Sequence, residues 1–211
     1  MDPCTLCETR KPRRHCLAAH ADICSQCCGQ EREVSLDCPF ECEYLSEARK
    51  HDKTPPVDEA SLPNRDVRLT QEFVYELEPV IAVLMHAVLD AAAATPGAVD
   101  NDVREALGAL IKTYRTMQSG LIYDTRPANP YADSIQQRVR ASIEDFKRRI
   151  HEAQGMHTIR DSEILGCLVF VERLELQNNN GRRRGRAFLH SLYEMRIRQM
   201  QAAEGQPAAT P

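Results

Sequence analysis

Eight of the nine cysteines in this 211-residue chain lie within its first 42 residues, and few apolar side chains accompany them. So short a segment cannot bury enough apolar surface to fold by a core alone. Disulfides are the weaker explanation, because the total is odd and no signal peptide opens the chain. The sequence therefore predicts metal ligation in a cysteine-rich module over residues 1–53.

Spacing divides the candidate ligands into four pairs once one histidine is admitted. They are Cys4 with Cys7, Cys16 with His20, Cys24 with Cys27, and Cys38 with Cys42. Two intervening residues suit a tight turn and three suit one helical turn, so both spacings let a pair face one ion. Eight donors suffice for two zinc ions, the number we favour, while one zinc ion and an iron–sulfur cluster are the alternatives. Cys28 and His15 are spare donors that could replace a neighbour.

The order of these pairs resembles the cross-brace zinc fingers of the MYND and HIT kind. The resemblance covers residues 4–42 and rests on the eight paired donors, although this chain ends in Cys-x3-Cys where those families close with His-x3-Cys. It implies that the first and third pairs share one metal and that the second and fourth pairs share the other. The module is also similar to cysteine-cluster segments of bacterial proteins, which implies no activity.

Thiolate-rich coordination is typical of a structural zinc site, whereas a catalytic zinc keeps one position open for water. Carboxylates that could act as a general base are available, namely Glu31, Glu33, Glu41 and Glu43. No phosphate loop, nucleophile elbow or His-Glu-x-x-His sequence accompanies them. We therefore predict no enzymatic activity and identify no small-molecule substrate. The competing hypothesis is a redox or metal sensor, in which the thiol of Cys28 reacts and the metal is ejected.

The rest of the chain has a helical pattern. Pro55, Pro56 and Pro63 predict a linker over residues 54–66, and apolar residues recur at helical spacing over residues 67–203. Five amphipathic stretches with short connections predict an antiparallel bundle, followed by a disordered tail over residues 204–211. The predicted fold class is mainly α, with a small N-terminal zinc-binding module followed by a bundle of about five helices.

Three local signals refine these helices. Pro79 predicts a kink or a break in the first long stretch. Asp100 or Asn101 is expected to cap the next helix. Pro39 is expected in the first turn of a short helix at the end of the cysteine module, where its missing N–H costs no hydrogen bond.

Four arginines lie at the start of the last helical stretch, namely Arg182, Arg183, Arg184 and Arg186. Cations at a helix start oppose its dipole, so compensating anions are expected nearby. A nucleic-acid backbone or a phosphate ligand could supply them, and so could glutamates of the preceding helix such as Glu172 and Glu175. Internal pairing or solvation is the simpler interpretation. A second basic run, Arg10 to Arg14, could help to grip a phosphate backbone. The expected partner is a protein or a nucleic acid.

Net charge and hydropathy limit the remaining classes. A net charge of −4 argues against a protein that coats nucleic acid along its whole length. The most apolar stretch, residues 80–94, contains His86 and Asp90 and is shorter than the roughly 20 residues that span a bilayer. We therefore expect a cytoplasmic protein without membrane association, which acts by recognition through a surface that zinc shapes.

Overall fold

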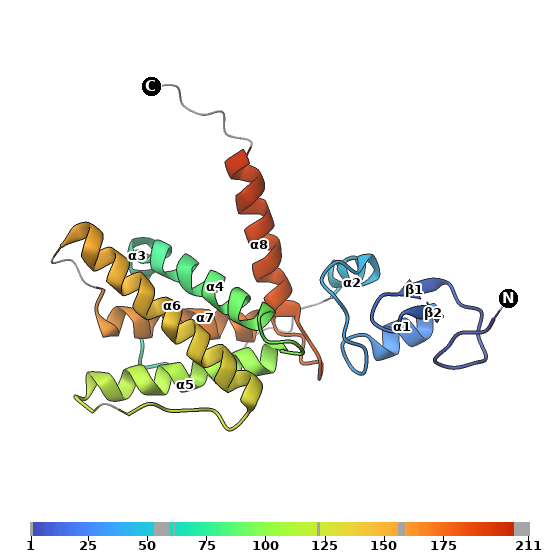
Figure 1. Ribbon diagram of the computed structural model, residues 1–211, viewed down its shortest axis with the longest axis horizontal. Coiled ribbons are helices and arrows are strands. Elements are labelled where there is room, and N and C mark those ends of the chain that lie inside the picture. The colour runs from blue at the N-terminus through green and yellow to red at the C-terminus, as the bar shows by residue number, and fades with distance from the viewer. Residues whose placement is uncertain (1, 53–59, 61, 122, 156–158, 205–211) are drawn as a thin grey trace. The chain divides into compact units, whose positions relative to one another are not determined.

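The computed structural model describes residues 2–52, 60, 62–121, 123–155 and 159–204 (Figure 1). Its elements in chain order are β1 (Arg14–Cys16), β2 (Ala21–Ile23), α1 (Ser25–Glu31), α2 (Glu43–Arg49), α3 (Gln71–Glu76), α4 (Glu78–Ala93), α5 (Asp100–Gln118), α6 (Pro130–Gln154), α7 (Asp161–Asn178) and α8 (Ala187–Glu204). The predicted fold class is confirmed, because the protein is mainly helical and carries its two short strands near the N-terminus. Within the described ranges, no helix has both the length and the apolar character needed to cross a lipid bilayer.

The chain divides into two compact units, each built from two segments. The cysteine unit comprises Met1–Pro55 and Asn179–Arg186, and the helical unit comprises Pro56–Asn178 and Ala187–Pro211. The segment Asn179–Arg186, here called the returning segment, falls in the range that the sequence assigned to the helical domain. The linker predicted over residues 54–66 lies largely outside the described residues, as does the predicted tail beyond Glu204.

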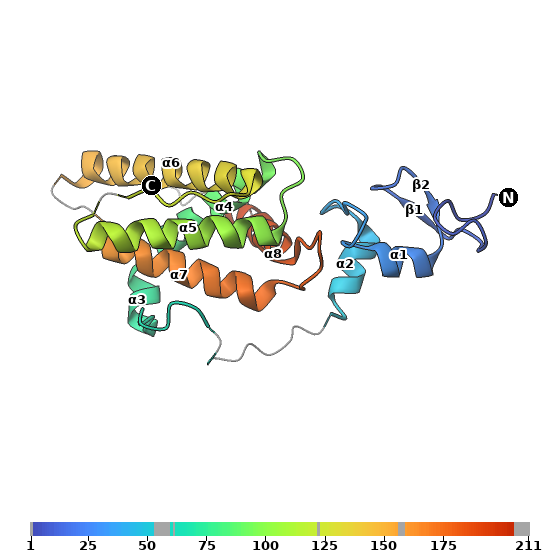
Figure 2. The same cartoon turned by 90° about the horizontal axis from the view of Figure 1, so that it is seen from below.

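Four helices form the centre of the helical unit. Helices α4 and α5 each pack against both α6 and α7, and α8 packs against α4 and α7. Figure 2 shows α5 lying between α6 and α7. Fully buried side chains come from all five of these helices, among them Val88, Val103, Leu110, Ile135, Leu168 and Phe188. The helical unit therefore has an apolar core of its own.

Pro79 marks a break between two helices rather than a kink within one. Leu77 ends α3 and also precedes the first residue of α4, and Pro79 lies in the first turn of α4. A proline is tolerated there because the first N–H groups of a helix have no partner within it. The first predicted helix therefore consists of two helices, α3 and α4. About five helices were expected in the helical unit, and its described part contains α3 to α8.

Asp100 caps a different helix from the one expected. Val99 precedes α5, and its own N–H donates to Asp102 Oδ2 at 2.9 Å. The carboxylate of Asp100 is buried and accepts the N–H groups of Phe188 and Leu189, at 2.9 and 3.1 Å. These two residues lie in the first turn of α8. Asp100 thus satisfies the free N–H groups of a helix that begins almost ninety residues later.

The cysteine unit is a hairpin with two short helices. Strands β1 and β2 pair antiparallel, with Cys16 opposite Ala21. Helix α2 follows Cys42, so Pro39 lies in the turn before this helix and not in its first turn as predicted. The buried cluster of the unit consists mainly of cysteines, with a few aliphatic side chains such as Leu45 among them.

Candidate metal centre

Turns and a helix start position the first four cysteines. The Glu8 N–H donates to the Cys4 carbonyl at 2.7 Å and closes the turn that carries Cys7. Cys24 precedes α1, and its Sγ accepts the Cys27 N–H at 3.4 Å. The Cys24 N–H in turn donates to Cys4 Sγ at 3.1 Å. The N-terminal turn and the start of α1 are therefore joined through sulfur.

The ligand atoms of Cys4, Cys7, Cys24 and Cys27 all lie within 4.8 Å of one another. Zinc–sulfur bonds of about 2.3 Å in a tetrahedron place sulfurs about 3.8 Å apart, so small side-chain rotations suffice to close this group on one ion. Three of the four side chains are buried, and Cys7 is half-buried. These are the first and third predicted pairs, which the cross-brace resemblance expected to share a metal. The group can bind a metal ion such as zinc.

Hydrogen-bond donors favour the thiolate form at two of these sulfurs, those of Cys7 and Cys24. Hydrogen bonds from Thr9, through its side chain first and then its backbone, lower the pKa of Cys7 to about 5. The backbone N–H of Cys27 lowers the pKa of Cys24, whereas burial raises the pKa of Cys27 to about 12. The guanidinium of Arg10 lies 3.7 Å from Cys24 Sγ and 3.8 Å from Cys27 Sγ. Nearby cations and amides stabilise the ionised form of cysteine, which is the form that ligates metals.

The remaining predicted cysteine ligands lie at a second place in the unit. Cys16, Cys38 and Cys42 line one small cavity, and Cys28, which the sequence treated as a spare donor, lines it as well. Three of these side chains are buried, and Cys42 is half-buried. All nine cysteines of the chain are free thiols.

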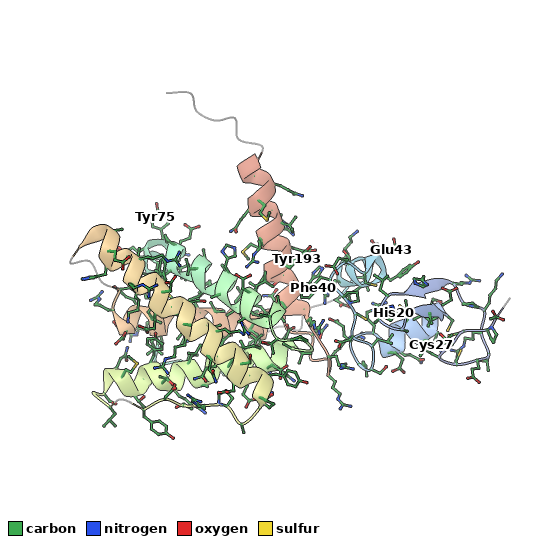
Figure 3. The ribbon with its side chains drawn as sticks, viewed as in Figure 1. His20, Cys27, Phe40, Glu43, Tyr75 and Tyr193 are labelled. Atoms are coloured by element: carbon green, nitrogen blue, oxygen red, sulfur yellow. The ribbon has the colours of Figure 1, made fainter. Side chains whose placement is uncertain are left out.

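The two histidines that the sequence offered as ligands, His20 and His15, are exposed. His20 lies on the turn between β1 and β2 with a φ of 48° (Figure 3), and it is absent from the described residues that line the cavity beside Cys16. His15 borders the cavity, yet its side chain is 66% exposed and its Nδ1 lies 3.0 Å from Asp22 Oδ1. The structure therefore clusters four cysteines at the first place and lines one cavity with four others at the second. His20 belongs to neither set, and His15 lies at the edge of the cavity.

Three of the four arginines predicted to bind an anion interact within the cysteine unit. Arg182 donates to the carbonyl of Arg32 at 2.6 Å. Arg186 and Arg184 form ion pairs with Asp37 at 2.9 and 3.5 Å. The returning segment therefore adds cations to the loop that follows α1.

Glu33, which the sequence offered only as a possible general base, is the main side-chain acceptor of this loop. Its Oε1 accepts the Arg49 side chain at 2.6 Å and the Arg186 N–H at 2.9 Å. Its Oε2 accepts the Asn180 side-chain amide at 2.7 Å, and its carbonyl accepts the Arg184 N–H at 2.8 Å. The excess of arginines in residues 182–186 predicted a nearby anion, but it did not indicate that Glu33 would supply the charge.

The glutamates that the sequence offered as internal partners bind other groups. Glu175 forms an ion pair with Arg104 at 2.7 Å, and Glu172 accepts the Asn64 amide at 2.7 Å. Arg183, the fourth arginine of the predicted set, is exposed. An anion-binding role for this set stays a prediction.

No protein-family model, curated protein or solved structure matches this chain. The resemblance to MYND and HIT fingers accordingly rests on the order of the eight paired donors in the sequence alone. The function of the site has to be inferred from its own geometry.

Proposed function

We propose that this protein is a zinc-binding, non-enzymatic recognition protein, in which zinc holds the cysteine unit in shape for binding a protein partner. The observation that carries the proposal is the group of four cysteine sulfurs within 4.8 Å of one another. Zinc is the divalent ion that closed tetrathiolate groups typically hold in structural sites. In so small a unit, metal ligation supplies folding free energy that the core lacks.

The ligand set favours a structural role for the metal over a catalytic one. Four thiolates complete a tetrahedron and leave no position for water or substrate. The buried carboxylate of Glu33 already accepts hydrogen bonds from Arg49 and Asn180, and Glu31 accepts one from Ser35. A general base needs a free carboxylate within reach of the reacting water. These two carboxylates are therefore poor candidates for that role.

The surface of the cysteine unit favours a protein partner over nucleic acid. Three arginines of the returning segment already donate to acceptors within the unit, which leaves fewer guanidinium groups for a phosphate backbone. Leu6, Leu17 and Val34 are at least 40% exposed on this unit. Apolar side chains displayed on a rigid surface suit contact with a protein.

Metal content and cobalt substitution test the structural site. Full-length protein purified without added metal should contain zinc and show no visible absorbance. The cobalt-substituted protein should give the spectrum of a tetrahedral thiolate site, unchanged by azide because a closed site has no exchangeable position. Iron with a brown chromophore, or a cobalt spectrum that azide shifts, would contradict the proposal.

Retention on immobilised DNA and RNA at low salt tests the class of partner. We expect no salt-dependent retention of the zinc-loaded protein. Retention that weakens when Arg182, Arg183 and Arg184 are replaced by alanine would assign nucleic-acid binding instead. Rapid zinc loss under mild oxidant would favour the sensor hypothesis.

A further inference from the structure

A second set of four cysteines lines one cavity of the cysteine unit. Cys16, Cys28, Cys38 and Cys42 line one cavity of about 10 Å³. They come from the end of β1, from α1, from the turn before α2, and from the residue that precedes α2. None of them belongs to the first group. The eight N-terminal cysteines are thus divided into two sets of four.

Local geometry explains why Cys28 belongs with this second set. Adjacent residues of an α-helix point about 100° apart, so Cys28 faces a different direction from its neighbour Cys27. Cys42 lies in a turn that its own N–H closes on the carbonyl of the preceding proline, three residues back. That turn lets Cys38 and Cys42 line the same cavity. Cys16 completes the lining from the adjacent hairpin strand.

The size and the walls of the cavity restrict what it can hold. About 10 Å³ is the space of a single water-sized sphere, which is too small for an organic ligand. Ile23, Leu36 and Leu45 form buried apolar parts of the wall. Sulfur is therefore the main donor available, and sulfur ligands select zinc over magnesium or calcium.

A cation lies beside one of the four sulfurs. Arg14 donates to Cys28 Sγ at 3.2 Å, and the same guanidinium lies 4.7 Å from the ring centroid of Tyr44. The contact with the ring holds the guanidinium beside this sulfur. Arg10 lies in a similar way beside two sulfurs of the first group. Each set of four cysteines thus has one arginine next to it.

We propose that Cys16, Cys28, Cys38 and Cys42 bind a second zinc ion, separate from the ion of the first group. This inference rests on the proposed zinc binding by the cysteine unit. Its ligand set differs from the one that the sequence spacing favoured, because Cys28 takes the place of His20. Four sulfur–zinc bonds form as the thiols release their protons to solvent. Zinc keeps its oxidation state, so the step needs no oxidant or reductant.

Zinc stoichiometry of full-length variants tests the assignment. In the presence of a competing chromophoric chelator, the unmodified chain is expected to retain two zinc ions. Cys28→Ser and the double variant Cys38→Ser/Cys42→Ser should each retain one. His20→Ala is the matched control, because it removes the exposed histidine and should leave both ions in place.

A second variant keeps the test informative if Cys28→Ser does not fold. Imidazole can replace a thiolate as a zinc ligand, so Cys28→His should recover the second ion that Cys28→Ser loses. In its cobalt form, the sulfur-to-cobalt charge-transfer band should be weaker than in the unmodified protein. Failure of Cys28→His to recover the ion overturns the role of Cys28.

The remaining outcomes separate this inference from the proposed function. A single ion that Cys7→Ser/Cys27→Ser removes and Cys28→Ser keeps overturns the second site and leaves the proposed function intact. Two ions in Cys28→Ser with one in His20→Ala overturn the choice of Cys28. The absence of zinc from carefully reduced protein overturns both proposals.

Discussion

The carboxylate of Glu33 is only 1% exposed, and it accepts hydrogen bonds from two distant parts of the chain. Arg49 reaches it from α2 at 2.6 Å, and Asn180 reaches it from the returning segment at 2.7 Å. Removing one partner of a buried ion pair is costly, because the remaining charge is left unpaired away from water. The packing of the returning segment therefore depends in part on this side chain, beside the contacts of its arginines with Arg32 and Asp37.

Glu33→Ala should destabilise the cysteine unit by about 3–5 kcal/mol, because it leaves the guanidinium of Arg49 buried without its carboxylate. Glu33→Gln keeps an acceptor and should lose less. The temperature at which zinc is released to a chromophoric chelator measures the effect. Glu41→Ala, at an exposed position of the same unit, is the control and should leave that temperature unchanged. Equal release temperatures for Glu33→Ala and Glu41→Ala would refute the role of Glu33.

Cys167 should resist thiol reagents as long as the helical unit is folded. It lies in α7 with 0% exposure, and burial raises its pKa from 9.0 to about 12. Reagents attack the thiolate, so iodoacetamide at pH 8 should label this residue only in denaturant. A raised pKa in the folded state stabilises the fold below pH 9, and this contribution is lost as the pH rises from about 9 to about 12.

Peptide mapping by mass spectrometry measures the labelling of Cys167 directly. Labelling should remain slow at pH 8 and accelerate only as the pH rises above 9. Cys167→Ala removes the signal and identifies the peptide. Rapid labelling of native protein at pH 8 would show that the thiol is accessible.

Residue types in the sequence predicted cysteines that lie close enough to bind a metal ion, but spacing alone did not predict how all the candidate donors are grouped. Cys4, Cys7, Cys24 and Cys27 follow from the Cys-x2-Cys pattern, and the structure brings all four together. His20 lies four residues after Cys16, yet the hairpin turn leaves it exposed. Cys28 looked redundant because it follows another cysteine, although a helix points consecutive side chains in different directions. The direction of a side chain depends on local structure that spacing does not encode.

At the level of elements, the first N–H groups of α8 donate to the carboxylate of Asp100, a residue of α5. Asp100→Ala should destabilise the helical unit by about 1–2 kcal/mol, because two N–H groups at the start of α8 lose their acceptor. Asp100→Asn retains one oxygen and should lose about half as much. Urea denaturation followed by far-UV circular dichroism measures the difference. Asn101→Ala, at the exposed neighbouring position, should cost less than either.

Trypsin reports whether the returning segment is held by the cysteine unit. With zinc bound, the arginines of this segment should be cut slowly, because Arg182 and Arg186 are engaged with Arg32 and Asp37. Chelation should increase the cleavage rate several-fold, and Glu33→Ala should do so even with zinc present.

Cleavage after Arg160 is the internal control for the trypsin experiment, because this exposed residue belongs to the helical unit. Its rate should be the same with and without zinc. A returning segment that is cut equally fast in both forms would show that its contacts do not depend on the metal.

Local sequence signals predicted the positions of helix starts better than they predicted which side chains accept the free N–H groups there. Pro79 indicated the boundary between α3 and α4, because a proline cannot donate within a helix. Asp100 has the chemistry of a helix cap and is one, but for a helix far along the chain. Pro39 was expected to start α2, yet the turn that carries Cys42 delays the helix to Glu43. Long-range pairing decided the role of Asp100, whereas a local turn decided where α2 begins.

For the whole molecule, removal of the metal should affect the two units differently. The cysteine unit has few aliphatic side chains in its buried cluster, whereas the helical unit has an extended apolar core. A strong chelator should therefore abolish amide-exchange protection in β1, β2 and α1 and preserve it in α4 to α7. Far-UV ellipticity should fall only slightly, since most helical residues lie in the helical unit. Loss of protection in both units together would contradict this expectation.

The division of the cysteine unit into Met1–Pro55 and Asn179–Arg186 has a consequence for its biosynthesis. The cysteines are translated before the returning segment, which supplies Asn180 as a partner of Glu33. At typical elongation rates the interval is on the order of ten seconds. During translation the cysteines therefore lack part of their own unit until the returning segment has been synthesised.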